Sequence, residues 1–288
     1  MRASLKHGLL SATLLLGLID ATSAAHAQDS SITVTGKTQP PAKTAQRFIR
    51  QVLDTDDGQL ARFTDPVCLQ VLGLPPKLSG TFEGRFREDV RDAGARLARG
   101  KCDPNLMILF VANSDGFMKM MRKYHSTFFA DLPDAERRKA LEPGAIRGWR
   151  QLAMRDDMGN ISGFESDPDS PPVFEDPVRT VTINAVLVLD KQVAPGNSIG
   201  QLADYAAMRT LAGATPPKKG SITADSILSL FDPNATPHPT GLTDMDRKLL
   251  SGLYAMRDDV AEQDGRSQVY AISRGMAASP KPARPAKR

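Results

Sequence analysis

The chain has 288 residues, of which 41% are hydrophobic and 24% are charged, and its formal net charge is +4. This length suits one large domain or two small ones. The N-terminal apolar stretch is too short to span a membrane. No run of about 18 apolar residues occurs after it, so we expect no membrane-spanning helix in the rest of the chain.

The positive charge lies at the C-terminus. The segment 273–288 has no acidic residue and holds Arg274, Lys281, Arg284, Lys287 and Arg288, so the body of the chain is slightly acidic. We expect residues 271–288 to form a disordered basic tail rich in proline and alanine. The tail has no aromatic side chain to stack on bases, so we do not expect nucleic acid as a partner. An acidic envelope polymer remains an alternative partner for it.

Residues 1–27 have the three regions of a secretory signal peptide in the right order. A basic start is followed by an apolar core from Leu9 to Ile19 and by Ala25-His26-Ala27 before Gln28. We therefore expect cleavage near Ala27-Gln28 and a periplasmic or secreted protein. Residues 28–44 are polar and end at Pro40-Pro41, which indicates a flexible leader.

Apolar spacing predicts the elements of the first half. Residues 45–53 have helical spacing, and residues 79–99 form an amphipathic helix that Gly100 ends. Residues 64–76, with their prolines, are predicted as a loop and turn. The apolar run 105–113 has the length of a strand covered on both faces. Residues 115–133 and 134–144 are predicted as helices, whose methionines and phenylalanines are expected in the core. Trp149 is expected to anchor a connecting segment.

The second half continues with a long loop or irregular hairpin at 155–177, because acids, glycines and prolines crowd there. The β-branched run 178–190 predicts the strongest strand. A helix over 198–212 follows, and another begins after Thr243, which with Asp246 forms a variant of the capping box. We therefore predict one α+β domain over residues 45–262, with a mixed β-sheet packed under helices.

Cys68 and Cys102 are the two cysteines. The even count in an exported chain favours a disulfide between them. No histidine lies close to either in sequence, so they make a poor zinc site.

The stretch Gly196-Asn197-Ser198-Ile199-Gly200 has the Gly-x-Ser-x-Gly pattern of a hydrolase nucleophile. In that hypothesis Ser198, Asp225 and His238 would form the triad. However, residues 191–195 separate the strand from the turn, and His238 lies in a proline-rich segment. Ser198 has a simpler role as the N-cap of the following helix, and the triad stays an alternative.

The C-terminal half resembles the closing half of zincin metallopeptidases, and most closely a family of exported bacterial proteins of unknown function with a zincin-like plan. The resemblance spans residues 45–260. Ser226-Ile227-Leu228 matches the turn after the active-site helix, and Leu242-Thr243-Asp244-Met245-Asp246 with Leu253-Tyr254 matches the helix that follows. It implies an edge strand before an active-site helix over 198–212.

The metal ligands of that family are missing here. Tyr205, Ala206 and Arg209 stand at the positions of the two histidines and the glutamate, and residues 190–237 contain no histidine. The resemblance therefore implies a zincin-like plan with no metal, no cofactor and no peptidase activity. We expect a non-catalytic envelope protein with a binding or scaffolding role, whose candidate cleft includes Asp204, Tyr205 and Arg209. We also expect Arg209 to pair with an acid on a neighbouring element.

Overall fold

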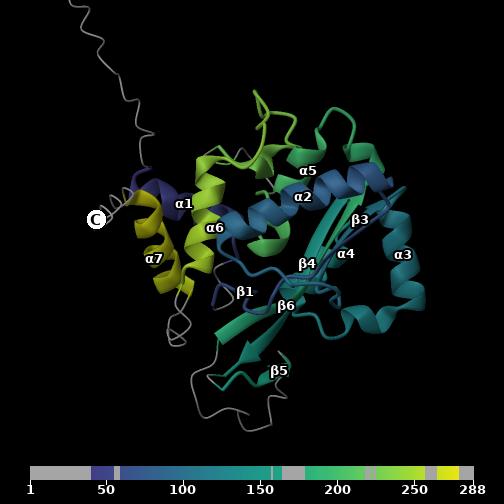
Figure 1. Ribbon diagram of the computed structural model, residues 1–288, viewed down its shortest axis with the longest axis horizontal. Coiled ribbons are helices and arrows are strands. Elements are labelled where there is room, and N and C mark those ends of the chain that lie inside the picture. The colour runs from purple at the N-terminus through teal and green to yellow at the C-terminus, as the bar shows by residue number, and fades with distance from the viewer. Residues whose placement is uncertain are drawn as a thin grey trace, which may run out of the picture. The chain divides into compact units, whose positions relative to one another are not determined.

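A mixed β-sheet forms the centre of the computed structural model, which describes residues 40–54, 59–156, 158–163, 179–217, 222, 225–256 and 265–278 (Figure 1). The strand order is β2-β3-β6-β4-β5, and β1 pairs with the beginning of β6. The pairs β1–β6, β2–β3 and β3–β6 are parallel, whereas β4 is antiparallel to β5 and β6. The strands are β1 (Arg62–Phe63), β2 (Leu69–Leu72), β3 (Leu106–Val111), β4 (Ile146–Arg155), β5 (Ile161–Gly163) and β6 (Arg179–Asp190).

Helices cover both faces of this sheet, because side chains alternate along the central strands. In β3, Leu106, Ile108 and Phe110 enter the larger core, and Met107, Leu109 and Val111 pack against the smaller one. The larger core includes residues of α1 (Ala42–Val52), α2 (Pro76–Ala93), α5 (Ile199–Leu211), α6 (Asp244–Tyr254) and α7 (Gly265–Ala277). The smaller core includes residues of α3 (Ser114–Tyr124), the 3-10 turn η1 (Ser126–Phe129) and α4 (Asp134–Leu141). The fold class is α+β, as predicted.

Helices α5 and α6 begin where the sequence predicts, each after its expected N-cap residue. The Ser198 hydroxyl accepts a hydrogen bond from the backbone of Gln201, whose side chain accepts one in return from the Ser198 amide. Thr243 and Asp246 form the same capping box at α6. Both boxes satisfy backbone amides that the first helical turn leaves without partners.

Three strands, β1, β2 and β4, were not predicted. Residues 69–72 pair with β3 although they were interpreted as a loop. Trp149 lies not in a connecting segment but in β4, between β6 and β5. Arg147 and Arg150 interrupt the apolar pattern of β4 at buried positions, where carboxylates of Asp115 and Glu136 pair with them. Because arginines occupy these buried positions, the sequence of β4 does not show the apolar pattern that would predict a strand.

The boundaries of α2 also differ from the prediction. The helix begins at Pro76, which suits the first helical turn, and ends at Ala93 because Gly94 adopts a left-handed conformation with φ of 84°. Leu97 was expected on the apolar face of the predicted helix 79–99, but it forms a β-bridge with Val67 instead.

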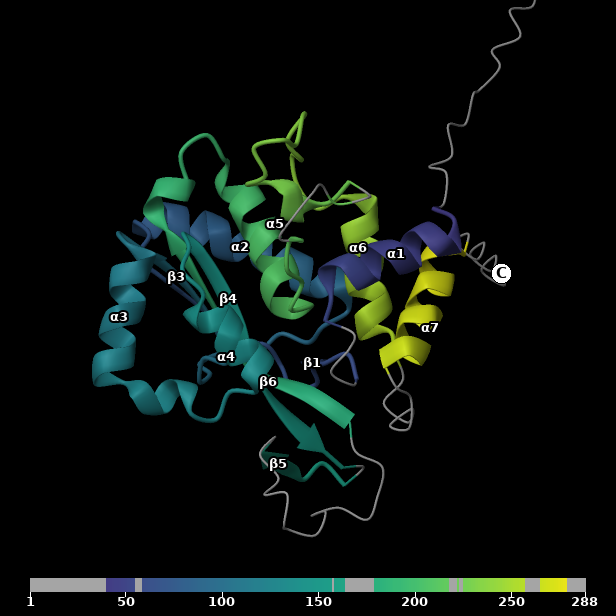
Figure 2. The ribbon, with the colours of Figure 1, turned by 180° about the vertical axis from the view of Figure 1, so that it is seen from behind.

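Helices α1 and α7 lie side by side next to α6 (Figures 1 and 2). α1 begins at Ala42, inside the predicted leader, and α7 extends to Ala277, inside the predicted tail. α7 buries Val269, Ile272 and Met276. These apolar residues recur at helical spacing, which predicts a helix even though the composition indicated a disordered tail. The predicted signal peptide, residues 28–39 and residues 279–288 lie outside the described residues.

The structure brings Cys68 and Cys102 to disulfide distance, with 2.07 Å between their sulfur atoms. Among the described helices, none has both the length and the apolar character needed to cross a bilayer.

Candidate binding groove

Two adjoining hollows lie along residues 222 and 225–243, and Tyr205 is the one α5 residue in their described lining. The first has a volume of about 350 Å³, and Tyr205, Leu228 and Phe231 are among its lining residues. The second has a volume of about 540 Å³ and is lined by residues such as Asp225, His238 and Leu242. Ile222, Ser229 and Asp232 line both hollows. We call the two together the α5 groove, and its volume is in the range of ligand pockets.

Tyr205 is held in a fixed position at the first hollow. Its ring meets that of Phe231 edge to face, with 4.9 Å between the centroids. Its hydroxyl accepts a hydrogen bond of 2.7 Å from Arg209 Nη1. Both Tyr205 and Arg209 are buried, and among the described residues Arg209 makes no ion pair with the acid that the sequence analysis expected. A Cβ on Gly148 of β4 would lie 3.2 Å from Arg209 Nη2, so the strand leaves little space for another partner on that side.

Asp204 lies on a different side of α5 from Tyr205 and connects three elements. Arg85 of α2 donates to it from Nε at 2.5 Å and from Nη2 at 3.1 Å. The backbone amide of Leu242, in the wall of the groove, donates to Asp204 Oδ2 at 2.6 Å. A Cβ on Gly241 would lie only 2.7 Å from the same oxygen, so the loop approaches Asp204 closely. Asp204 therefore positions the groove wall.

Asp89 of α2 completes this buried cluster. Its carboxylate lies 3.4 Å from Arg85 Nη2 and has no hydrogen-bond donor among the described residues. Burial raises the pKa of Asp89 to about 8, and the negative charge of Asp204 adds to the increase while Arg85 opposes it. A protonated Asp89 can donate to Asp204, which explains how two acids share one arginine.

The opposite wall is fixed by Asp246 of α6. Ser226 Oγ donates to Asp246 Oδ1 at 2.6 Å, and the Ile227 amide donates to Oδ2 at 2.7 Å. These bonds attach the turn η3 (Ile227–Ser229) to the beginning of α6. Burial raises the pKa of Asp246 although these groups donate to it.

The residues of the hypothetical triad are not joined by hydrogen bonds in the described part of the chain. Asp225 and His238 line the second hollow, whereas the Ser198 hydroxyl caps α5 and is absent from the described lining of either hollow. The side chain of Gln201 donates to the Pro239 carbonyl at 2.7 Å, which connects the capped end of α5 to the histidine's loop.

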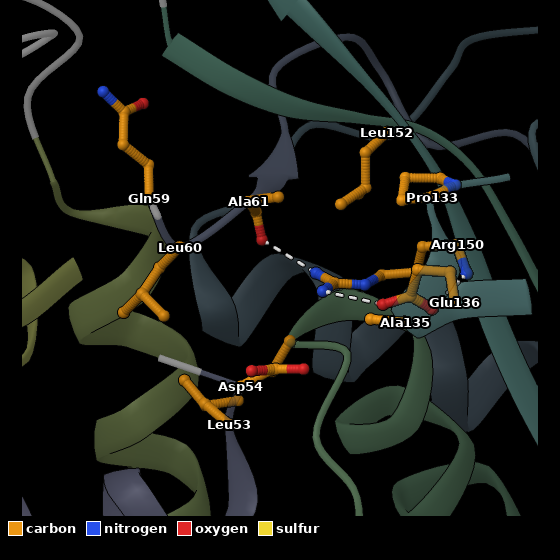
Figure 3. Close-up of a pocket in the computed structure, with 11 residues that line it drawn as sticks. Leu53, Asp54, Gln59, Leu60, Ala61, Pro133, Ala135, Glu136, Arg150 and Leu152 are labelled. Atoms are coloured by element: carbon orange, nitrogen blue, oxygen red, sulfur yellow. Dashed lines mark hydrogen bonds and ion pairs between the residues drawn. The ribbon is translucent and has the colours of Figure 1, made fainter. Parts of the chain in front are cut away.

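A third cavity, of about 60 Å³, lies between β4, α4 and the end of α1 (Figure 3). Arg150 points into it and donates to the Ala61 carbonyl at 3.0 Å, and it pairs with Glu136. Burial alone would raise the pKa of Glu136, but Arg150 and Lys139 together lower it. This volume holds a few waters at most, so we interpret the cavity as a structural ion-pair site.

The sequence analysis did not predict Phe231 or the prolines that line the α5 groove as site residues. It also did not predict the ion pair between Arg85 and Asp89. A signal for the pair was present: Asp89 lies between Phe86 and Val90 on the apolar stripe of α2, where an unpaired acid would be costly. No comparable pattern marks Phe231, because its contact with Tyr205 depends on the path of the loop.

Comparison with known proteins adds no relative: no family model, no curated protein and no solved structure matches this chain.

Proposed function

We propose that this chain is a non-catalytic binding protein of the bacterial cell envelope whose ligand occupies the α5 groove. The observation that carries the proposal is the groove itself: a hollow of ligand size with an aromatic pair, the buried Tyr205 and the partly buried Phe231, at one end. Its walls are fixed by Asp204 and Asp246, so the groove exists before a ligand arrives. A preformed site loses little conformational freedom on binding.

The charge of the groove indicates the class of ligand. Asp225 and Asp232 are its acids, and no lysine or arginine is among the described lining residues. The rest of the described lining mixes polar side chains, His238 among them, with apolar ones, and it includes Pro216, Pro217, Pro233, Pro237 and Pro239. A neutral or positively charged extended ligand suits this surface, because its cations would face the two carboxylates.

The absence of catalysis is part of the proposal and is supported by how the candidate side chains are used. The Ser198 hydroxyl accepts a bond at the N-terminus of α5. In the zincin-like interpretation Tyr205, Ala206 and Arg209 replace the metal-binding residues, and the cation of Arg209 would repel Zn²⁺. The order β6, α5, turn η3 and α6 along the chain agrees with that interpretation. The expected edge strand before α5 was wrong, because β6 pairs with β3 on one side and β4 on the other.

A labelled peptide with the sequence of residues 279–288 is a suitable probe, since it is basic and rich in proline. We expect fluorescence anisotropy to show binding that Asp225→Asn with Asp232→Asn weakens by about tenfold, or about 1.4 kcal/mol. Asp103→Asn with Asp131→Asn, an equal change at exposed sites outside the groove lining, should leave the affinity unchanged. No binding, or equal loss in both double variants, would contradict the proposed ligand class.

Elemental analysis addresses the zincin-like part separately. Protein purified without chelator should carry no stoichiometric zinc, and a chelator should leave its melting temperature unchanged. About one tightly held zinc per chain, with loss of stability on chelation, would contradict the metal-free interpretation.

A further inference from the structure

Helix α3 and the turn η1 expose apolar side chains at the surface of the smaller core, on the sheet face opposite α5 (Figure 1, right). Met118 and Phe129 are buried and anchor the segment. Met120 and Tyr124 are exposed by 39% and 64%. Phe128 is exposed by 41%, although its ring also meets that of Trp149 edge to face. The sequence analysis expected these methionines and phenylalanines in the core, and for Met120 and Phe128 that was wrong.

Three cations accompany this apolar surface. Lys119, Arg122 and Lys123 are exposed and make no ion pair among the described residues. Lys123 Nζ lies 5.0 Å from the centre of the Tyr124 ring. Residues four apart lie one above the other on a helix, so Met120 and Tyr124 form one ridge and Lys119 and Lys123 form the next. We call these five side chains, with Phe128, the α3 face.

The acids near the α3 face do not cancel its charge. Asp115, in the first turn of α3, is paired with Arg147 of β4. Asp131 follows η1 and is exposed. The ridge of lysines therefore keeps a net positive charge beside the apolar ridge.

We propose that the α3 face binds the surface of a lipid bilayer that contains anionic lipid. An apolar ridge beside a cationic ridge is what an interfacial helix presents: the apolar side chains enter the boundary between headgroups and acyl chains, and the cations meet the negative headgroups. At 11 residues α3 is too short to span the bilayer, so it lies in the surface plane. A purely acidic polymer would engage the lysines and leave Met120, Tyr124 and Phe128 without a role.

The test is flotation of the full chain with vesicles of phosphatidylcholine alone or with one quarter phosphatidylglycerol. We expect binding to the anionic vesicles and little to the neutral ones. Lys119→Glu with Arg122→Glu and Lys123→Glu should reduce the bound fraction about tenfold. The control triple Arg91→Glu, Arg99→Glu and Lys101→Glu changes the charge equally at exposed sites elsewhere and should bind as the parent does.

The apolar ridge is tested separately, by Met120→Ser with Tyr124→Ser and Phe128→Ser. Its control is Leu72→Ser with Leu78→Ser and Tyr270→Ser, at exposed apolar sites outside the α3 face. Circular dichroism checks that every variant is folded. If the serine triple binds like its control, charge alone is responsible and the proposal is wrong. It is equally wrong if replacing the cations of residues 279–288 by glutamine abolishes binding while the α3 charge reversal does not.

Discussion

Asp89 lies on the buried face of α2, and its carboxyl group has Arg85, Asp204 and Asp92 as the charged groups that affect it. Its pKa is raised to about 8, so the folded chain holds a proton that the unfolded chain releases at about pH 4. Between these pH values the folded state binds more protons than the unfolded state. Stability therefore falls as pH rises through this window, and the loss is complete above about pH 8.

Asp89→Asn should remove this dependence, because asparagine is neutral and can donate to Asp204 as the protonated acid does. We expect the variant to be more stable than the parent at pH 8.5 by more than about 1.4 kcal/mol, the equivalent of one pKa unit. The difference should vanish near pH 4. Urea unfolding at both pH values measures it, with Asp103→Asn, at an exposed site outside α2, as the control. A parent protein whose stability rises between these pH values would contradict the assignment.

Ser198 gives a second prediction for a single side chain. Its hydroxyl accepts from the Gln201 amide at 3.1 Å, so Ser198→Ala should cost about 1 kcal/mol of unfolding free energy. Ser198→Asp should be tolerated, because a carboxylate also caps a helix and suits its dipole. Thermal unfolding of both variants measures the effect. Covalent labelling by a fluorophosphonate probe that both variants lose would instead favour the hydrolase hypothesis.

Helices α2 and α5 differ in how closely other side chains approach the glycine that follows each of them. Both are followed by a glycine with positive φ, Gly94 at 84° and Gly213 at 64°. A Cβ on Gly94 would have no heavy atom closer than 3.9 Å, whereas one on Gly213 would lie 2.1 Å from Arg150 Cζ. At Gly213 the backbone conformation and the approach of a buried arginine both exclude a side chain.

This difference can be measured with a matched pair of alanine variants. Gly94→Ala should cost about 1–2 kcal/mol, the strain of a left-handed residue with a Cβ. Gly213→Ala should cost more, because Arg150 must also move away from Glu136 and the Ala61 carbonyl. Urea unfolding compares the two, and equal losses would show that Arg150 adapts freely.

Elements with an uninterrupted pattern could be predicted from the sequence, and others could not. The apolar run of β3, the β-branched residues of β6 and the capping boxes of α5 and α6 each carry their own local signal. β4 carries Arg147 and Arg150 at buried positions, and only the tertiary partners Asp115 and Glu136 make these acceptable. In the site, Tyr205, Asp225 and His238 were candidates, but Phe231 was not. Its contact with Tyr205 depends on the path of the loop after η3, which no local pattern reveals.

At the scale of the whole molecule, Cys68 and Cys102 connect the beginning of β2 to the residues before β3, across a separation of 34 residues that contains α2. The same junction is held by non-covalent bonds. Asn105 Oδ1 accepts from the Cys68 amide at 2.8 Å, and Asn105 Nδ2 donates to the Pro66 carbonyl at 3.1 Å. The folded junction therefore has partners of its own, and a covalent link acts mainly by restricting the unfolded chain.

Replacing both cysteines by alanine should accordingly preserve the fold and lower its stability. For a loop of this length the chain-entropy model gives a loss of about 3–4 kcal/mol, a large share of the roughly 5–15 kcal/mol that stabilises a typical domain. Circular dichroism should show unchanged secondary structure, and urea unfolding should show the loss. Reductant should destabilise the parent protein and leave the double variant unaffected. Intact mass after alkylation tests the bond directly: two alkylated thiols in protein that was never reduced would contradict it. Disulfides persist in oxidising compartments, so protein made in such a compartment is the correct sample.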